Sequence, residues 1–206
     1  MPNHTPVSPE IDAKFKTFDW RNGLAILQNV HAKEWQDVCE VLNHFTLKRS
    51  HLSAKGRGNK SEMAGMLDSE LYNRGWVEKS FDTRVVVDGV ERPTPTHSVD
   101  CFTGRIALEV EWNNKDPFFD RDLNNFRLLY DLHVIDVGII ITRTTELQKW
   151  LNANYRIFDK ASGTYGGSTT HEDKLIPRIL GGGAGGCPVI VFAIMTEAYE
   201  DDGQTQ

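Results

Sequence analysis

Apolar residues at helical spacing predict most of the helices. They recur at that spacing between residues 23 and 45, which predicts one long helix or two shorter ones. Ser61 can cap a second amphipathic stretch, and the Arg74-Gly75 pair gives that stretch a natural end. Residues 123–132 and 147–151 show the same period, and we expect two further helices there.

β-Branched runs predict the strands between these helices. Residues 83–90 are β-branched and contain the turn signal Asp88-Gly89, which predicts a strand followed by a tight turn. Residues 134–142 and 188–195 are nearly continuous apolar runs, typical of strands that are covered on both faces. The glycine cluster at 181–186 precedes a strand and lacks a following Lys-Ser/Thr, so we interpret it as a tight connection and not a phosphate loop. The predicted fold class is α/β, with a central mixed sheet flanked by helices.

Residues 106–112 alternate strictly between the two faces of a strand. One face carries only apolar residues: Ile106, Leu108, Val110 and Trp112. The other face carries Ala107, Glu109 and Glu111, so two carboxylates project side by side. Unpaired acids are costly to bury in the middle of an α/β chain unless a metal or another partner neutralises them.

Length and composition favour one soluble domain. The chain has 206 residues, 39% hydrophobic and 25% charged, and no apolar run approaches the ~20 residues of a membrane-spanning helix. We expect a single domain over residues 1–206, in which the proline-containing residues 1–10 form a loose, flexible arm. The first ten residues lack the pattern of a secretory signal, which predicts a cytoplasmic location. The three cysteines are too few and too far apart for a disulfide framework or a zinc cluster.

The formal net charge of -6 argues at first sight against a nucleic-acid partner, because phosphate binding needs local positive charge. Net charge is not local charge, however. A protein that gathers carboxylates for a divalent metal can be acidic overall and still present a basic cleft.

The chemistry concentrates where Asp100 precedes Glu109 by nine positions. Two carboxylates with the backbone carbonyl of Val110 between them make an oxygen-ligand site of the kind that Mg²⁺ prefers. Glu111 then lies close enough to orient or deprotonate a water. From the local pattern alone, a solvated Glu-x-Glu face and a turn aspartate remain open alternatives.

The residues that carry this pattern resemble the PD-(D/E)xK superfamily of restriction endonucleases. Within it, the chain is most similar to the BglII/BstYI-like group of type II enzymes and more distantly to BamHI. The similar segments follow the same order over about two-thirds of the chain: Asn73-Arg74-Gly75-Trp76, Val99-Asp100, the run from Arg105 to Glu111, Ile135-Asp136-Val137-Gly138, and the glycine-rich turn before Pro188-Val189-Ile190-Val191.

The resemblance implies that Asp100 and Glu109 are the metal-binding acids of a restriction-endonuclease-like core. Glu111 departs from the family pattern, because most of the superfamily has Lys at this position and the BglII-like enzymes have Gln. A Glu there resembles BamHI and implies a role in activating water. Glu62 is our candidate for the further acid or amide that these enzymes place near the metal.

Two stretches are candidates for DNA binding. The basic segment 48–60 suggests a mobile loop that clamps phosphates, and we name Lys55, Arg57 and Lys60. The polar, glycine-rich segment 160–171 should be an exposed loop that reads bases. Its candidate contacts are Lys160, Ser162, Tyr165, Ser168, Thr169, Thr170 and His171.

These observations predict a homodimeric type II restriction endonuclease that uses Mg²⁺ to cut double-stranded DNA at a short palindromic site. Two alternatives stay open. One is a repair or structure-specific nuclease on the same core, and the other is a DNA-binding module without catalysis, which the missing Lys would explain.

Overall fold

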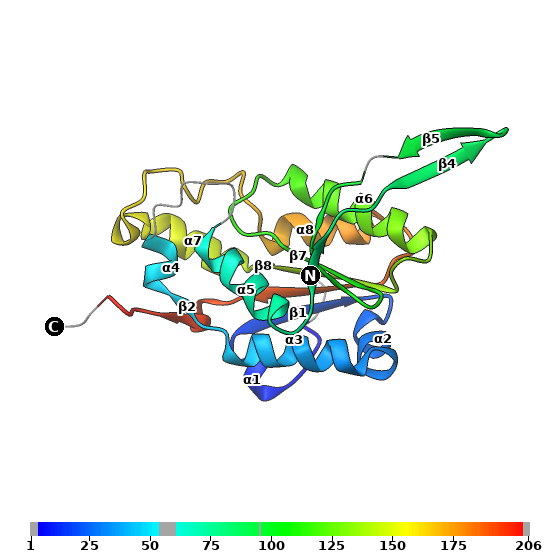
Figure 1. The fold of residues 1–206 in the computed structure, drawn as a ribbon. Helices are drawn as coiled ribbons and strands as arrows, with labels where there is room; N and C mark the ends of the chain where they lie inside the picture. Colours follow the sequence, from blue (N-terminus) through cyan, green and yellow to red (C-terminus); the bar gives the residue numbers. More distant parts are fainter. Residues whose placement is uncertain (1–3, 54–60, 95, 204–206) are drawn as a thin grey trace.

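A computed structural model describes residues 4–53, 61–94 and 96–203 of the chain (Figure 1). Its larger helices and strands, in order, are α1 (Pro9–Asp12), β1 (Phe15–Trp20), α2 (Gly23–Val30), α3 (Ala32–His44), α4 (Arg49–Ser53), α5 (Glu62–Tyr72), β3 (Val77–Lys79), β4 (Thr83–Val87), β5 (Val90–Thr94), β6 (Val99–Thr103), β7 (Ile106–Val110), α6 (Pro117–Asp131), β8 (Val137–Arg143), α7 (Thr145–Ala153), α8 (Glu172–Leu180) and β9 (Val189–Ile194). The short elements are β2 (Leu47–Lys48) and β10 (Tyr199–Glu200), which pair with each other, and the 3-10 turns Tyr155–Phe158 and Thr196–Ala198.

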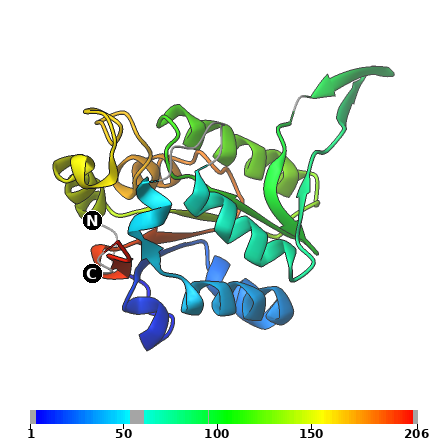
Figure 2. The same cartoon turned by 60° about the vertical axis from the view of Figure 1, so that its left-hand side comes forward.

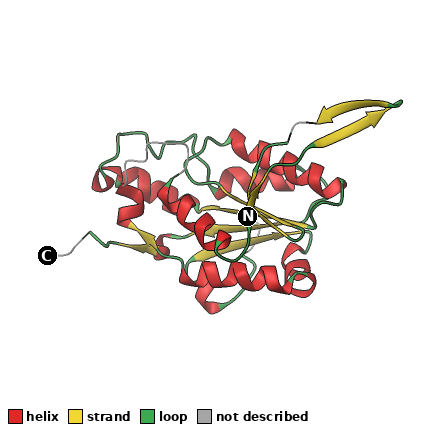
Figure 3. Cartoon of the chain, viewed as in Figure 1, coloured by secondary structure: helices red, strands yellow, loops and turns green. Residues whose placement is uncertain are grey.

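Six strands form one mixed sheet in the order β1-β9-β8-β7-β6-β3. The central strands β7, β8 and β9 are parallel, because helices connect them, whereas β1, β6 and β3 run antiparallel to their neighbours. β8 is buried along its whole length, as its continuous β-branched sequence predicts. Figure 3 shows the sheet between two sets of helices.

Each face of the sheet has its own core. The first core gathers the apolar side of β7 with α2, α3, α5 and α7, and the second joins α6 and α8 to the opposite side of the sheet. Ile106, Leu108, Val110 and Trp112 all lie in the first core, while Ala107 lies in the second. The alternation predicted from the sequence is therefore confirmed, as is the α/β fold with a central mixed sheet.

A hairpin, β4–β5, extends away from the body of the protein (Figures 1 and 2). Its two-residue turn is formed by Asp88 and Gly89, both with positive φ, of 52° and 78°. This conformation matches the right-handed twist of the strands, which is why Asp-Gly predicts it.

Two segments differ from the sequence-based expectations. The described part of the loose arm, residues 4–10, is held against β1: Thr5 N donates to the Thr17 carbonyl and the His4 ring accepts from Thr17 N. Ser8 then caps α1. The expected exposed loop at 160–171 is partly buried. Among the described residues, no helix has the length and apolar character needed to cross a membrane.

Candidate active site

The candidate site lies where β6 and β7 separate. The two strands pair from Cys101 and Leu108 to the turn between them, and Asp100 and Glu109 follow directly beyond the last pair. There, side-chain carboxylates replace backbone carbonyls as hydrogen-bond acceptors. Asp100 N donates to Glu109 Oε2 at 3.2 Å, and Val110 N donates to Asp100 Oδ2 at 3.1 Å. The two acids predicted as metal ligands are thus brought together, beside the Val110 carbonyl.

Glu111 follows β7 and points to the same side of the sheet as Glu109. Its backbone N–H donates to the Ile141 carbonyl, so β8 continues to fix its position. Its carboxylate is 2% exposed and accepts a hydrogen bond from Asn114 Nδ2 at 2.8 Å. Sequence reasoning did not identify Asn114 as the partner of this carboxylate.

Helix α6 covers this side of the sheet and brings two charged residues to the glutamates. Asp122, fully buried, accepts from the Arg121 guanidinium, whose Nη2 lies 3.1 Å from Asp122 Oδ1 and 3.6 Å from Glu111 Oε1. His97 precedes β6, and its Nε2 lies 3.3 Å from Glu109 Oε1 and 3.2 Å from Asp122 Oδ1. The sequence-based prediction included none of these three residues.

Burial and crowding make these carboxylates hard to ionise. Desolvation raises the pKa of Glu109, and the neighbouring Asp122 and Asp100 raise it further against the opposing effect of His97. Desolvation and the adjacent Asp122 also raise the pKa of Glu111. Burial alone would lower the pKa of His97, but the Asp122 and Glu109 carboxylates, within 3.3 Å of its Nε2, outweigh burial and raise that pKa to about 9.

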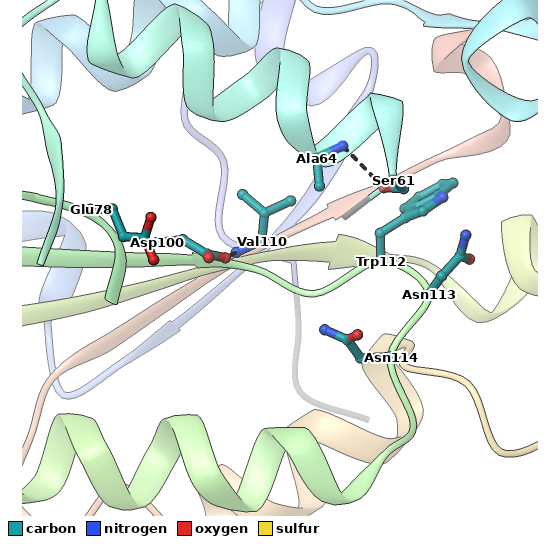
Figure 4. A pocket seen from close by; sticks show the side chains of 8 residues that line it. All are labelled: Ser61, Ala64, Glu78, Asp100, Val110, Trp112, Asn113 and Asn114. Atoms are coloured by element: carbon teal, nitrogen blue, oxygen red, sulfur yellow. Dashed lines mark hydrogen bonds between the residues drawn. The ribbon is translucent and has the colours of Figure 1, made fainter. Parts of the chain in front are cut away.

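A cavity of about 280 Å³ opens beside Asp100 on the α5 side of the sheet. Figure 4 shows Asp100 and Val110 at its floor, α5 on one side and Glu78 next to Asp100. The full lining is Ser61, Ala64, Glu78, Asp100, Val110, Trp112, Asn113 and Asn114.

Two glutamates compete for the role of the additional acid. Glu62, predicted for it, is exposed at the start of α5 and is not part of this lining, although its neighbour Ser61 is. Glu78 on β3 faces the cavity instead. Sequence reasoning missed Glu78 because the three-residue β3 is too short for a period to show.

The donor set suits a divalent cation. The candidate ligands are carboxylate and carbonyl oxygens, which hard cations such as Mg²⁺ prefer. Glu109 is only 1% exposed, and its Oε1 accepts no hydrogen bond from the described residues. A bound cation would compensate such a buried carboxylate oxygen for its lost hydration.

The segment 160–171 is packed beside the site. Thr170 N donates to the Asn114 carbonyl, and Thr170 Oγ1 donates to the Trp112 carbonyl at 3.1 Å. The buried Arg143 donates to the carbonyls of Thr170 and Trp112 and stacks on Tyr165. These contacts tie the segment to the residues that follow Glu111.

The expectation of an exposed loop is therefore wrong for Tyr165, Thr169 and Thr170, which are buried. Ser162 and Ser168 are exposed, and Lys160 and His171 are partly so. Those four keep an accessible surface.

The basic segment falls partly outside the described residues. Its beginning is ordered as β2 and α4, contrary to the expectation of a mobile loop from residue 48 onwards. Lys55, Arg57 and Lys60 lie outside the described residues, so their predicted contacts with phosphates stay predictions.

The comparisons with known proteins agree with this geometry. A family model described as restriction endonuclease BglII/BglIII matches residues 15–194, a range that begins with β1 and ends with β9. The match contains all the acids of the site. A search of the curated proteins finds no match.

Proposed function

We propose that this chain, which belongs to the restriction endonuclease BglII/BglIII family, cleaves double-stranded DNA at a short palindromic site by Mg²⁺-dependent hydrolysis of phosphodiester bonds. The observation that carries this proposal is the meeting of Asp100, Glu109, Glu111 and the Val110 carbonyl where β6 and β7 separate.

In this proposal Asp100, Glu109 and the Val110 carbonyl hold the cation. When bound, Mg²⁺ lowers the pKa of a water and neutralises the charge that develops on the phosphate. Val110 N keeps Asp100 oriented, and Asp100 N does the same for Glu109. The ligands are thus preorganised by the backbone of the two strands.

Glu111 orients the attacking water and accepts its proton. The hydrogen bond from Asn114 Nδ2 fixes the direction of its carboxylate. Glu78, on the cavity wall beside Asp100, is a candidate for a further acid at the cation. Glu62 remains the alternative for that role.

DNA would lie along the cavity side, with the accessible residues Lys160, Ser162, Ser168 and His171 near the bases or backbone. We also propose a homodimer, because two copies related by a two-fold axis place one site on each strand of a palindrome.

Cleavage of a plasmid by Asp100→Asn and Glu109→Gln proteins tests this proposal. With Mg²⁺ and wild-type protein we expect discrete fragments that EDTA abolishes. Both variants should cut at least about 100-fold more slowly while keeping a native circular dichroism spectrum. The exposed Glu200→Gln variant is the matched control and should cut normally.

Cutting by the two variants at the wild-type rate would overturn the assignment of the site. A smear in place of discrete fragments would favour a repair or structure-specific nuclease. Binding of DNA without any metal-dependent cutting would favour a module that only binds.

A further inference from the structure

A second group of metal-ligating side chains lies on the α6 side of the sheet, away from the Asp100 cavity. His97, Glu109 and Asp122 place one potential ligand atom each within 4.8 Å of one another. A separate cavity of about 240 Å³ is lined by His97 and Arg121 among others.

The distances within the group match those of a chelated cation. His97 Nε2 lies 3.3 Å from Glu109 Oε1 and 3.2 Å from Asp122 Oδ1. Two ligand atoms bound at about 2.1 Å to a tetrahedral cation stand about 3.4 Å apart. Two of the three ligand pairs are therefore already at a separation that a chelated cation requires.

Hydrogen bonding leaves this group incomplete. His97 Nε2 can carry only one proton, which two carboxylates would share. Glu109 Oε1 and Asp122 Oδ2 are both buried and accept no hydrogen bond within the part of the chain that the structure describes, and their residues are 1% and 0% exposed. Buried anionic oxygens without a donor are the feature that a cation corrects.

We propose that His97, Glu109 and Asp122 form a second cation site, selective for a divalent transition metal such as Co²⁺ or Zn²⁺. The imidazole ligand favours these ions over Mg²⁺, which prefers oxygen ligands alone. Glu109 serves both sites, because its Oε2 faces Asp100 N and its Oε1 faces His97.

Co²⁺ is the probe, because a paramagnetic ion shifts the exchangeable N–H of a coordinating imidazole far outside the normal proton spectrum. His97 would bind through Nε2, which leaves its Nδ1–H as the reporter. We expect one such signal in the full-length wild-type protein, and its absence from His97→Gln. The exposed His44, on α3 across the sheet, provides the control variant His44→Gln, which should keep the signal.

Asp122→Asn, which is isosteric, tests the site if His97→Gln does not fold. It should weaken Co²⁺ binding at least about tenfold while circular dichroism stays native. A missing signal in the wild type, or a signal that persists in His97→Gln, would overturn the proposal. Unchanged Co²⁺ affinity in Asp122→Asn would do the same.

Asp100→Asn separates this site from the proposed nuclease site. The variant should keep the shifted imidazole signal, because Asp100 is not a ligand of the second cation, yet lose Mg²⁺-dependent cleavage. Loss of the signal in Asp100→Asn would mean a single shared site and would refute a second one. A wild-type protein that shows the signal but cuts no DNA would refute the nuclease proposal alone.

Discussion

Replacing Glu111 by Gln should stabilise the metal-free protein at alkaline pH. The buried carboxylate lies against Asp122, accepts a hydrogen bond from Asn114 and forms a longer ion pair with Arg121. A Gln amide has nearly the same shape, can still accept from Asn114, and carries N–H donors for a neighbouring carboxylate.

The size of the effect follows from proton linkage. Desolvation and Asp122 raise the pKa of Glu111 from 4.5 to about 9. Because the folded protein holds this proton more tightly than the unfolded chain, the stability is fully present below pH 4.5 and is lost as the pH rises toward 9. One pKa unit corresponds to about 1.4 kcal/mol, which sets a ceiling of about 5 kcal/mol at pH 8. Glu109 and Asp122 remain in the variant, so we expect a gain of about 2 kcal/mol.

Urea unfolding in EDTA at several pH values between 5 and 9 measures this difference. The free energies of unfolding of wild type and Glu111→Gln should agree near pH 5 and diverge as the pH rises. The exposed Glu200→Gln variant should follow the wild type throughout. Parallel pH profiles for wild type and Glu111→Gln would refute the reasoning, because they would mean that Glu111 ionises normally in the folded protein.

Two further changes test the site and the fold. Glu78→Gln should slow Mg²⁺-dependent cleavage more than Glu62→Gln does, because Glu78 faces the cavity beside Asp100; a larger loss in Glu62→Gln would restore the sequence-based assignment. Gly138→Ala should lower the free energy of unfolding by about 1–3 kcal/mol, because the new Cβ would stand 2.3 Å from Phe126 Cδ2. Gly167→Ala meets no atom within 4 Å and is the control, and equal unfolding midpoints for the two alanine variants in urea would contradict the packing argument.

The strand that carries the acids was predictable because a period of two admits a single interpretation. Once Ile106 and Leu108 are buried on one face, Glu109 and Glu111 must project from the other. The β4–β5 turn was predictable for a similar local reason, since Asp88-Gly89 accepts positive φ at both positions.

Elements that depend on tertiary contacts escaped the sequence analysis. β1 at the sheet edge carries Lys16, whose ammonium reaches the buried Glu172 at the start of α8. α8 contains Pro177 inside the helix, which propensity alone opposes. The packing of Leu175 and Ile179 against the second core outweighs that cost.

The segment 160–171 also depends on a tertiary contact, which orders residues whose composition is typical of an exposed loop. Its small and polar residues are typical of an exposed loop, yet Arg143, buried inside the strand run, needs carbonyl acceptors and takes one from Thr170. The hydrogen bonds of one buried guanidinium thus hold this polar segment in an ordered conformation beside the site.

The packing of α6 brings Asp122 to the site, and the sequence pattern of this helix indicates that Asp122 is buried. Phe119, Leu123 and Phe126 place the apolar face of α6 on the sheet, and Asp122 lies on that same face. A chain that had only to fold would gain by an apolar residue there, because Asp122 brings a third carboxylate to two that burial already makes hard to ionise. The position of the Asp122 carboxylate is therefore best explained by a cation that Glu109, Glu111 and Asp122 bind together. The explanation is the same whether this cation lies on the Asp100 side or on the His97 side of Glu109.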